Sequence, residues 1–108
     1  MALTAKEIFE GKIATKLKES PDKATKINSI YQFNLTGDAP STWTLDLTQP
    51  GGKISEGAAT NAKCTVTISV ENLSNIVEKK LNPQMAFMTG KLKVAGDMGL
   101  ALKLGSIL

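Results

Sequence analysis

The spacing of apolar residues changes its period twice along this chain of 108 residues, and these changes limit the folds open to it. In residues 4–20 the apolar positions recur every three or four residues, as on one face of an α-helix. In the middle of the chain they alternate with polar residues, as in half-buried strands, and after residue 70 the helical spacing returns. Strands grouped together with helices around them predict an α+β fold with a mostly antiparallel sheet.

Local signals place three helices around the predicted strands. The first begins at Thr4, which forms a T-x-x-E capping box with Glu7, and it ends before Pro21. A second helix is predicted over residues 71–81, where the apolar residues again follow a helical spacing. A third, short helix begins after Asn82, because asparagine is a good N-cap and proline follows it at the first helical position.

Five segments have the alternation or the flanking turn signals of β-strands. In most of them the apolar side chains fall on one face and the polar side chains on the other. The run T-G-D-A-P at residues 36–40 is a turn signal, so the first two strands are predicted to form an antiparallel hairpin. The predicted strands are residues 29–35, 41–48, 53–56, 63–70 and 91–95.

The absence of two residue types excludes most catalytic chemistry. The chain has no histidine and no arginine; its thirteen basic residues are all lysines. Histidine-based triads, imidazole acid–base chemistry and histidine-ligated metal sites are excluded, as is an arginine clamp on phosphate. The only cysteine, Cys64, is interpreted as a small buried residue, and a single cysteine favours a reducing intracellular compartment. We therefore expect no metal, no cofactor and, at a net charge of +3 without arginine clusters, no nucleic acid partner.

Acidic residues leave one route to catalysis, as a small hydrolase or transferase. Paired carboxylates can act as general acid and base, and Glu7, Glu10, Asp46, Glu71 and Glu78 are the candidates. The first two are better explained as residues of a helix first turn, where acidic side chains stabilise the helix dipole. Asp46 falls on the polar face of its strand. The sequence therefore predicts a domain that is not an enzyme.

Apolar residues are concentrated towards the end of the chain in an unusual way. Residues 98–108 contain one charge, and Met85, Met88 and Met98 lie near Phe87. Methionine suits surfaces that accept varied apolar ligands, although such a cluster also fits an ordinary core. An apolar cavity needs few polar groups, because each methylene removed from water contributes about 0.8 kcal/mol to binding. Asn82, Gln84 and flanking lysines are candidates for its polar rim, or else cap and solvent contacts.

The residues from 81 to 104 resemble the signature of the sterol carrier protein 2 domain family. They read LNPQMAFMTGKLKVAGDMGLALKL, against a family pattern of about N-P-Q-x-A-F-x-x-G-K-L-K-x-x-G-[ND]-x-x-L-A-x-K-L. Two further runs match, W-T-L-D-L at residues 43–47 and the A-x-C-T-V-T-I-S pattern that ends at Ser69. The likeness extends over essentially residues 1–108, which we interpret as one lipid-binding domain.

The resemblance implies a five-stranded sheet covered by helices that encloses a hydrophobic tunnel. It also implies that the tunnel holds a fatty acid, fatty acyl-CoA, sterol or phospholipid. Sheet alternation independently groups Phe33 with Leu35 and Trp43 with Leu45. Carried over position by position, the expected lipid-binding residues are Phe33, Leu35, Trp43, Leu45, Gln84, Met85, Phe87, Met88, Met98, Leu100, Leu102 and Leu104.

Two functions follow from this resemblance. The first is lipid binding and transfer, with transient contact with membrane surfaces, by a monomer. The alternative is an accessory domain that presents acyl-CoA within a multidomain peroxisomal β-oxidation enzyme. A peroxisomal location is implied, but the last residues are Ser106-Ile107-Leu108, which lack the basic middle residue of a Ser/Ala-Lys-Leu import signal, so a cytoplasmic form is the alternative.

Overall fold

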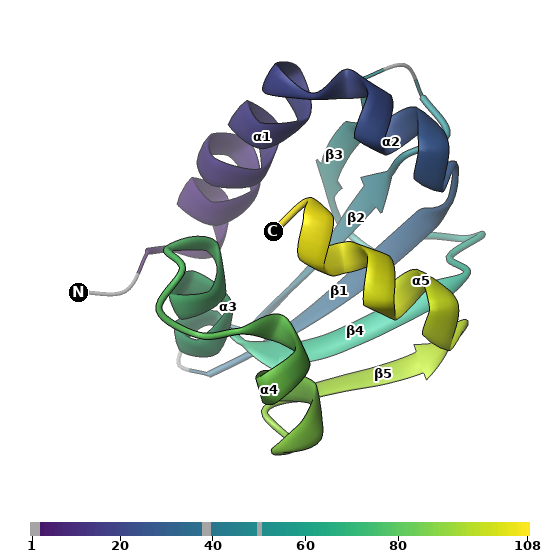
Figure 1. Cartoon of the computed structure of the whole chain (residues 1–108). Helices are drawn as coiled ribbons and strands as arrows, with labels where there is room; N and C mark the ends of the chain where they lie inside the picture. The colour runs from purple at the N-terminus through teal and green to yellow at the C-terminus, as the bar shows by residue number, and fades with distance from the viewer. Residues whose placement is uncertain (1–2, 38–39, 50) are drawn as a thin grey trace.

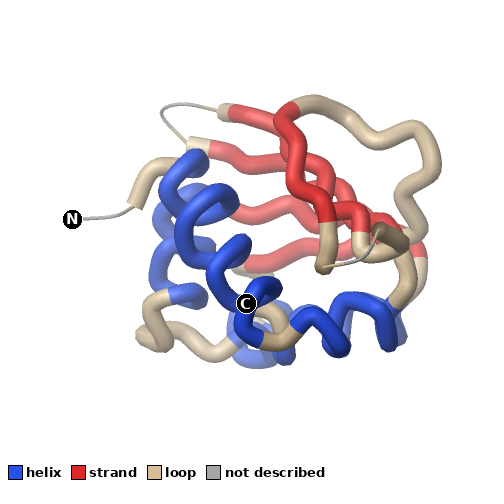
Figure 2. Tube along the Cα trace, turned by 90° about the horizontal axis from the view of Figure 1, so that it is seen from above, coloured by secondary structure: helices blue, strands red, loops and turns tan. Residues whose placement is uncertain are grey.

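The protein has two layers, a β-sheet and a group of helices that covers one of its faces (Figure 2). This architecture comes from a computed structural model, which describes residues 3–37, 40–49 and 51–108. The middle of the predicted 36–40 turn, Asp38 and Ala39, lies outside the described residues. The α+β class predicted from the sequence is confirmed, because the alternating segments form the sheet and the segments of helical period form the helices.

The predicted elements occur in the predicted order along the chain, and helical elements over residues 21–27 and 98–106 add to the three predicted helices (Figure 1). The strands are β1 (Ile30–Thr36), β2 (Ser41–Asp46), β3 (Lys53–Glu56), β4 (Cys64–Ser69) and β5 (Leu92–Gly96). The helical elements are the π-helix η1 (Glu7–Ile13), α1 (Ala14–Glu19), α2 (Pro21–Ile27), α3 (Val70–Val77), α4 (Pro83–Met88), α5 (Met98–Lys103) and the 3-10 helix η2 (Leu104–Ser106).

The five strands form one sheet in the order β3-β2-β1-β4-β5. The pairs β1–β2, β2–β3 and β4–β5 are antiparallel, whereas β1 and β4 run parallel, with Tyr31 opposite Cys64. Three of the four pairs are antiparallel, as a mostly antiparallel sheet requires, and the parallel β1–β4 pair makes the sheet mixed. The cause is topological, since the chain leaves β3 at one edge and re-enters the sheet on the far side of β1, in the direction of β1.

The buried face of the sheet meets the first helical segment through aromatic rings. The ring of Phe9 in η1 stacks on Trp43 of β2 at 5.0 Å and 7°, and it meets Phe33 of β1 edge-on at 5.1 Å. Phe9 and Phe33 are fully buried and Trp43 nearly so. Offset and edge-on pairs of this kind stabilise a core beyond the area they bury. These ring contacts pack η1 directly against β1 and β2.

The first helix begins as the sequence predicts but has a different winding. The Thr4 N–H donates to Glu7 Oε1 at 2.9 Å, and the Glu7 N–H donates to Thr4 Oγ1 at 3.2 Å, which confirms the capping box. The bond from the Thr4 N–H also lowers the pKa of the Glu7 carboxyl. The residues that follow form a π-helix, in which positions five apart share a face. Ile8 and Ile13 are consequently both fully buried.

Side-chain caps fix where three of the later helices start. Ser69 caps α3, Asn82 caps α4 and Asp97 caps α5, each accepting a hydrogen bond from a backbone N–H of the first helical turn. The Asn82 cap was predicted from the sequence, and Pro83 occupies the first turn of α4 as expected. These caps set the positions of α4 and α5, which border the site described next.

Candidate functional site

The C-terminal segment formed by α5 and η2 crosses the helical layer between α1 and α4 (Figure 1). It is tied to the sheet by the Tyr31 hydroxyl, which donates a hydrogen bond of 2.6 Å to the main-chain oxygen of Leu100. Burial of the hydroxyl raises the pKa of Tyr31. Four apolar side chains of this segment and of the two residues after it are buried: Leu100, Leu104, Ile107 and Leu108. Hollows open on both sides of it.

The first hollow, which we call the groove, lies between α4, β5 and the α5–η2 segment and has a volume of about 630 Å³. This volume is within the range of about 300–1,000 Å³ that is usual for small-molecule sites. Most of its lining is apolar, with Asn82 and Gln84 at the α4 end. The lining residues are Asn82, Pro83, Gln84, Phe87, Met88, Leu92, Val94, Met98, Ala101, Leu102, Leu104 and Gly105.

Several apolar side chains of the groove are exposed to solvent. Met88 is 77% exposed and Leu102 is 66% exposed, and Phe87 and Met98 are also exposed. Among the described residues, the large hydrophobic side chains with such exposure all lie on α4 and α5. Contiguous exposed apolar surface is uncommon on monomeric proteins and marks a ligand or interaction site.

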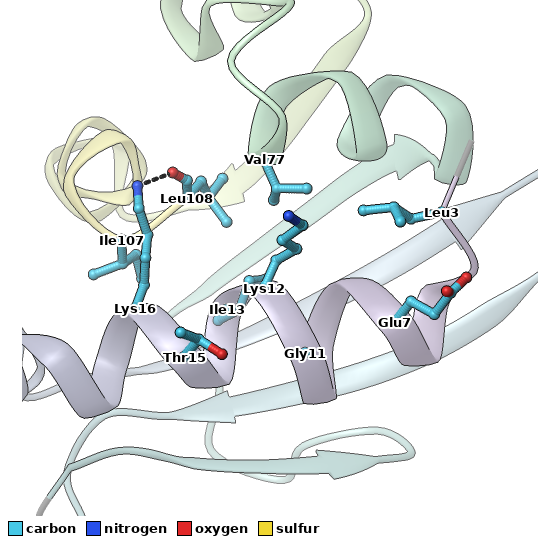
Figure 3. Close-up of a pocket in the computed structure, with 10 residues that line it drawn as sticks. All are labelled: Leu3, Glu7, Gly11, Lys12, Ile13, Thr15, Lys16, Val77, Ile107 and Leu108. Atoms are coloured by element: carbon cyan, nitrogen blue, oxygen red, sulfur yellow. Dashed lines mark hydrogen bonds between the residues drawn. The ribbon is translucent and has the colours of Figure 1, made fainter. Parts of the chain in front are cut away.

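The second hollow, which we call the lysine pocket, lies between the η1–α1 helix, α3 and the end of the chain, and has a volume of about 500 Å³ (Figure 3). Its apolar lining includes Ile13, Val77, Ile107 and Leu108, and Lys12 and Lys16 extend over these residues in Figure 3. The remaining lining residues are Leu3, Glu7, Gly11 and Thr15. The pocket therefore combines an apolar floor with cationic side chains.

Two lysine side chains converge on one main-chain oxygen beside this pocket. The Nζ of Lys16 donates to the oxygen of Leu108, and the Nζ of Lys79 donates to the same oxygen at 2.9 Å. Burial, together with the neighbouring Lys79 ammonium, lowers the pKa of Lys16 to about 8. Both ammonium groups therefore face a single acceptor, and Lys16 is less stable in its charged form than an ordinary lysine.

The structure divides the twelve predicted lipid-binding residues into two main sets. Six of them line the groove: Gln84, Phe87, Met88, Met98, Leu102 and Leu104. Five others are buried in the core: Phe33, Leu35, Trp43, Leu45 and Leu100. Met85 is exposed on α4 and is not among the described residues that line the groove.

Several residues of the two hollows were not predicted. Leu92 and Val94 line the groove, and their alternation on β5 was visible in the sequence as an inward face. The lysine pocket gave no comparable signal, because Lys16 lies on the η1–α1 helix and Lys79 in the turn after α3, and the two side chains meet at the Leu108 oxygen only in three dimensions. Trp43 borders a third hollow, which is more polar than the groove and whose lining includes Glu10 and Glu71.

Three of the five carboxylates considered for catalysis, Glu7, Asp46 and Glu78, accept hydrogen bonds from neighbouring groups. Glu7 belongs to the capping box, and Asp46 Oδ1 accepts a hydrogen bond from the Thr48 N–H at 2.9 Å. Burial raises the pKa of the Cys64 thiol, so this buried cysteine is poorly suited to act as a nucleophile. Over residues 3–37, 40–49 and 51–108, no cluster of three acidic or cysteine side chains is arranged to hold a metal ion. The groove has a mostly apolar lining, and the lysine pocket adds cationic side chains to an apolar floor.

The α+β fold, with helices over one face of its sheet and an apolar groove at their edge, is shared with proteins of one family. Residues 9–108 match the SCP-2 sterol transfer family. The chain is 46% identical over 85 residues to peroxisomal multifunctional enzyme A of Dictyostelium discoideum, a match that covers 77% of this chain and 19% of that protein. The chain spans about a fifth of the length of the curated relatives it matches.

Solved structures agree with this assignment. The apo form of sterol carrier protein 2 from Yarrowia lipolytica superposes with a TM-score of 0.76 and 32% identity, covering 93% of this chain and 85% of that one. Palmitated SCP2L2 from Aedes aegypti superposes with a TM-score of 0.80 and 28% identity, covering 97% and 94% of the two chains. The protein belongs to the SCP-2 sterol transfer family.

Proposed function

We propose that this domain binds one long-chain lipid between the sheet and the helical layer and transfers it between membranes, without catalysing a reaction. The observation that carries the proposal is the groove, an apolar hollow of about 630 Å³ that opens to solvent through exposed side chains of α4 and α5. The palmitated state of the Aedes aegypti relative supports a fatty acid as one ligand. Fatty acyl-CoA, sterol and phospholipid are the other candidates.

The α5–η2 segment is the barrier that a bound acyl chain would displace. Leu104 lines the groove, whereas Ile107 and Leu108 line the lysine pocket. Only two residues separate Leu104 from Ile107 in the sequence. The side chains of Leu104, Ile107 and Leu108 are buried. A small shift of η2 would join the two hollows into the hydrophobic tunnel expected from the family resemblance. The acyl chain would then replace the contacts of these side chains.

The lysine pocket supplies a position for the polar end of the ligand. The Leu108 oxygen accepts hydrogen bonds from Lys16 and Lys79, so a carboxylate or phosphate oxygen would find the same donors in its place. Lysines act here as point charges, because the chain has no arginine to form a bidentate contact. A fatty acid, acyl-CoA or phospholipid carries such an anionic group, whereas a sterol would depend on the apolar lining alone.

Titration of the delipidated protein with a fluorescent fatty acid tests this function. We expect one ligand per chain, and Phe87→Ala should weaken binding by about tenfold because it removes a large apolar part of the groove. Met85→Ala is the matched control, since Met85 is exposed on the same helix outside the groove lining. Failure of every long-chain lipid class to bind the folded protein would refute the proposal. Mass spectrometry of co-purifying lipids would identify the preferred class.

A second candidate function is an accessory domain that presents acyl-CoA to a catalytic domain on the same polypeptide. The observation that favours it is the match to a peroxisomal multifunctional enzyme over a fifth of that protein's length. The genomic reading frame on both sides of residues 1–108 decides between a free-standing carrier and an accessory domain. We propose a peroxisomal location on the same ground, with a cytoplasmic one as the alternative, and imaging of the tagged full-length protein distinguishes them.

A further inference from the structure

We infer that Lys16 is a covalent acylation site, whose side-chain amine accepts the acyl group of a fatty acyl thioester held in the lysine pocket. This inference goes beyond reversible lipid binding, and it rests on the proposed function because the thioester is the polar end of a lipid that the domain would carry. Two features of the pocket carry it: an amine that is partly removed from water, and a second ammonium group directed at the same oxygen atom.

Lys16 lies on α1 at the edge of an apolar surface. Its side chain is half-buried and extends towards the end of the chain, where its Nζ donates to the main-chain oxygen of Leu108 (Figure 3). The floor of the pocket is formed by the apolar side chains of Ile13, Val77, Ile107 and Leu108. A lysine in such surroundings loses hydration of its charged form, which favours the neutral amine. The neutral amine is the nucleophile in acyl transfer to a lysine.

The second ammonium group belongs to Lys79, in the turn after α3. Its Nζ donates to the Leu108 oxygen at 2.9 Å, so two Nζ atoms from different segments of the chain approach one oxygen. Burial, and then the charge of this neighbour, lower the pKa of Lys16 to about 8. At this pH about half of the Lys16 side chains are neutral, against fewer than about one in a hundred for a lysine of ordinary pKa.

The turn that presents Lys79 is held by its own backbone. The residue has a φ of +65°, and the N–H of Lys80 after it donates to the main-chain oxygen of Asn75 at 2.8 Å. The N–H of Lys79 itself donates to the oxygen of Ile76 at 3.1 Å. The position of the second ammonium group therefore depends on a defined turn.

Other charged groups surround the pocket. Lys12 and Glu7 belong to its lining, and the Glu7 carboxylate is engaged in the capping box. Lys23 lowers the pKa of Lys16 further, whereas Glu19 acts against this by raising it. Cationic groups stabilise the negative charge that develops on a carbonyl oxygen during nucleophilic attack. At Lys16 a half-buried position and a neighbouring ammonium coincide, whereas Lys12 of the same pocket is exposed.

The Leu108 oxygen marks where the carbonyl oxygen of the thioester would lie. That oxygen would receive the hydrogen bond of the Lys79 ammonium, and its carbon, about 1.2 Å away, would come within reach of Lys16 Nζ by rotation of the terminal side-chain torsion. The neutral amine forms a C–N bond with this carbon, and the Lys79 ammonium stabilises the oxyanion. Collapse of the adduct breaks the C–S bond, and the departing thiolate takes up the proton that the nitrogen loses.

The products are an amide on Lys16 and a free thiol, so the step needs no oxidant, reductant or further reactant. A lysine amide is much less reactive than a thioester, and the acyl group therefore stays on the nitrogen. The reaction modifies the protein once and is not a catalytic cycle. The modified chain would carry an acyl group that unfolding and organic extraction do not remove.

Incubation of the delipidated protein with octanoyl-CoA, followed by intact mass measurement and peptide mapping, tests the inference. We expect one octanoyl group per chain, which survives unfolding and maps to Lys16. Its rate of formation should rise with pH and level off above about 8, whereas the rate for N-acetyl-lysine amide should keep rising towards the ordinary pKa of 10.5. Octanoyl groups spread evenly over the exposed lysines of the wild type would overturn the inference.

Three variants separate the roles of the two lysines. Lys16→Arg keeps the charge and the hydrogen-bond donors without a nucleophilic amine, so the adduct should be lost. Lys79→Met should slow acylation of Lys16 at pH 8 by about tenfold or more, because the oxyanion loses its partner. Lys18→Arg is the matched control, since Lys18 is exposed on the same helix outside the pocket lining, and it should react like the wild type. An undiminished adduct in Lys16→Arg, or an unchanged rate in Lys79→Met, would overturn the inference.

Reversible binding of a fluorescent fatty acid, measured on the same samples, distinguishes failure of this inference from failure of the proposed function. Normal fatty acid binding without an adduct on Lys16 would overturn the inference and leave the proposed function intact. An adduct on Lys16 in a protein that binds no long-chain lipid would support the acylation site and refute the carrier.

Discussion

The hydroxyl of Tyr31, near the start of the central strand β1, donates a hydrogen bond of 2.6 Å to the main-chain oxygen of Leu100 in α5. Both residues are buried, so neither group has water as an alternative partner. At the other end of the same segment, Lys16 and Lys79 hold the oxygen of Leu108. The segment between the two hollows is therefore fastened at both ends by identifiable hydrogen bonds.

Removing the Tyr31 hydroxyl should loosen this segment. In Tyr31→Phe the Leu100 oxygen loses a buried donor, so we expect the free energy of unfolding to fall by about 1–3 kcal/mol. Release of a bound fatty acid should become faster, because α5 is no longer tied to β1. Thr44→Val is the matched control, since it removes the hydroxyl that donates to the Gly57 oxygen, away from α5. Urea unfolding and stopped-flow release measure the two effects; equal release rates in both variants would refute the role of the bond.

The pH dependence of stability should reveal the environment of Lys16. Its pKa is about 8 in the folded protein, below the ordinary value of 10.5, so the folded state disfavours the charged form. Between these two values the unfolded chain binds more protons than the folded one, and stability rises with pH through this window. Cys64 and Tyr31, whose pKa values are raised, act in the opposite direction at high pH.

Comparison with Lys16→Met isolates this contribution from those of the other groups. The unfolding free energy of the wild type, relative to that of Lys16→Met, should increase as pH rises from 8 to 10.5. The measurement is chemical unfolding of both proteins across this range. A difference that stays constant with pH would show that the Lys16 ammonium is solvated like an ordinary surface lysine.

Shortening the Leu104 side chain should lower the stability of the protein by an amount that depends on whether a lipid is bound. Leu104 is buried and lines the groove, so Leu104→Ala should lower the stability of the lipid-free protein by about 2–5 kcal/mol. Under the proposed function, palmitate occupies the vacated space and recovers part of this loss. Leu47→Ala removes an equally buried leucine outside the groove, and we expect no such recovery. Thermal unfolding with and without palmitate tests this, and equal recovery in both variants would contradict it.

Gly96 at the end of β5 should tolerate no side chain. Its φ is +103°, and a Cβ atom there would lie 2.5 Å from the main-chain oxygen of Lys63. Gly96→Ala therefore adds a backbone clash to conformational strain and should cost more than about 1 kcal/mol, with loss of the β4–β5 edge that carries Leu92 and Val94. Gly90→Ala has a comparable φ of +80° but open space around it, and it measures the strain alone. Equal destabilisation of the two variants would exclude the clash.

The strands and their inward faces were predictable from the sequence because alternation depends on local geometry. Phe33 and Leu35 were assigned to one face, and both are buried. Which strands are neighbours in the sheet was harder to predict. Alternation shows which side chains of a strand face inward, but not which strand lies next to it. The parallel contact between β1 and β4 depends on a crossover that no local pattern encodes. The π-helical winding of η1 was not predicted, because the apolar residues in 4–20 recur every three or four positions, as in an α-helix, whereas the buried Ile8 and Ile13 lie five residues apart.

The candidate site was predictable where its residues are contiguous in sequence. Met85, Phe87, Met88 and Met98 were singled out from the unusual apolar content towards the end of the chain, and all of them except Met85 line the groove. Residues predicted from strand alternation, such as Phe33 and Leu45, face the helices but are enclosed in the core. Alternation places a side chain on the buried face and cannot distinguish a packed core from the wall of a cavity.

The most direct test of the central claim is a titration with palmitate followed through the methionine methyl resonances by NMR. Met88 and Met98 line the groove, whereas Met85 is exposed on the same α4 helix as Met88 and lies outside its lining. We predict that the Met88 and Met98 methyl signals shift and saturate at one palmitate per chain while the Met85 signal stays in place. Unchanged signals from Met88 and Met98, or shifts of all three that do not saturate, would contradict lipid binding in the groove.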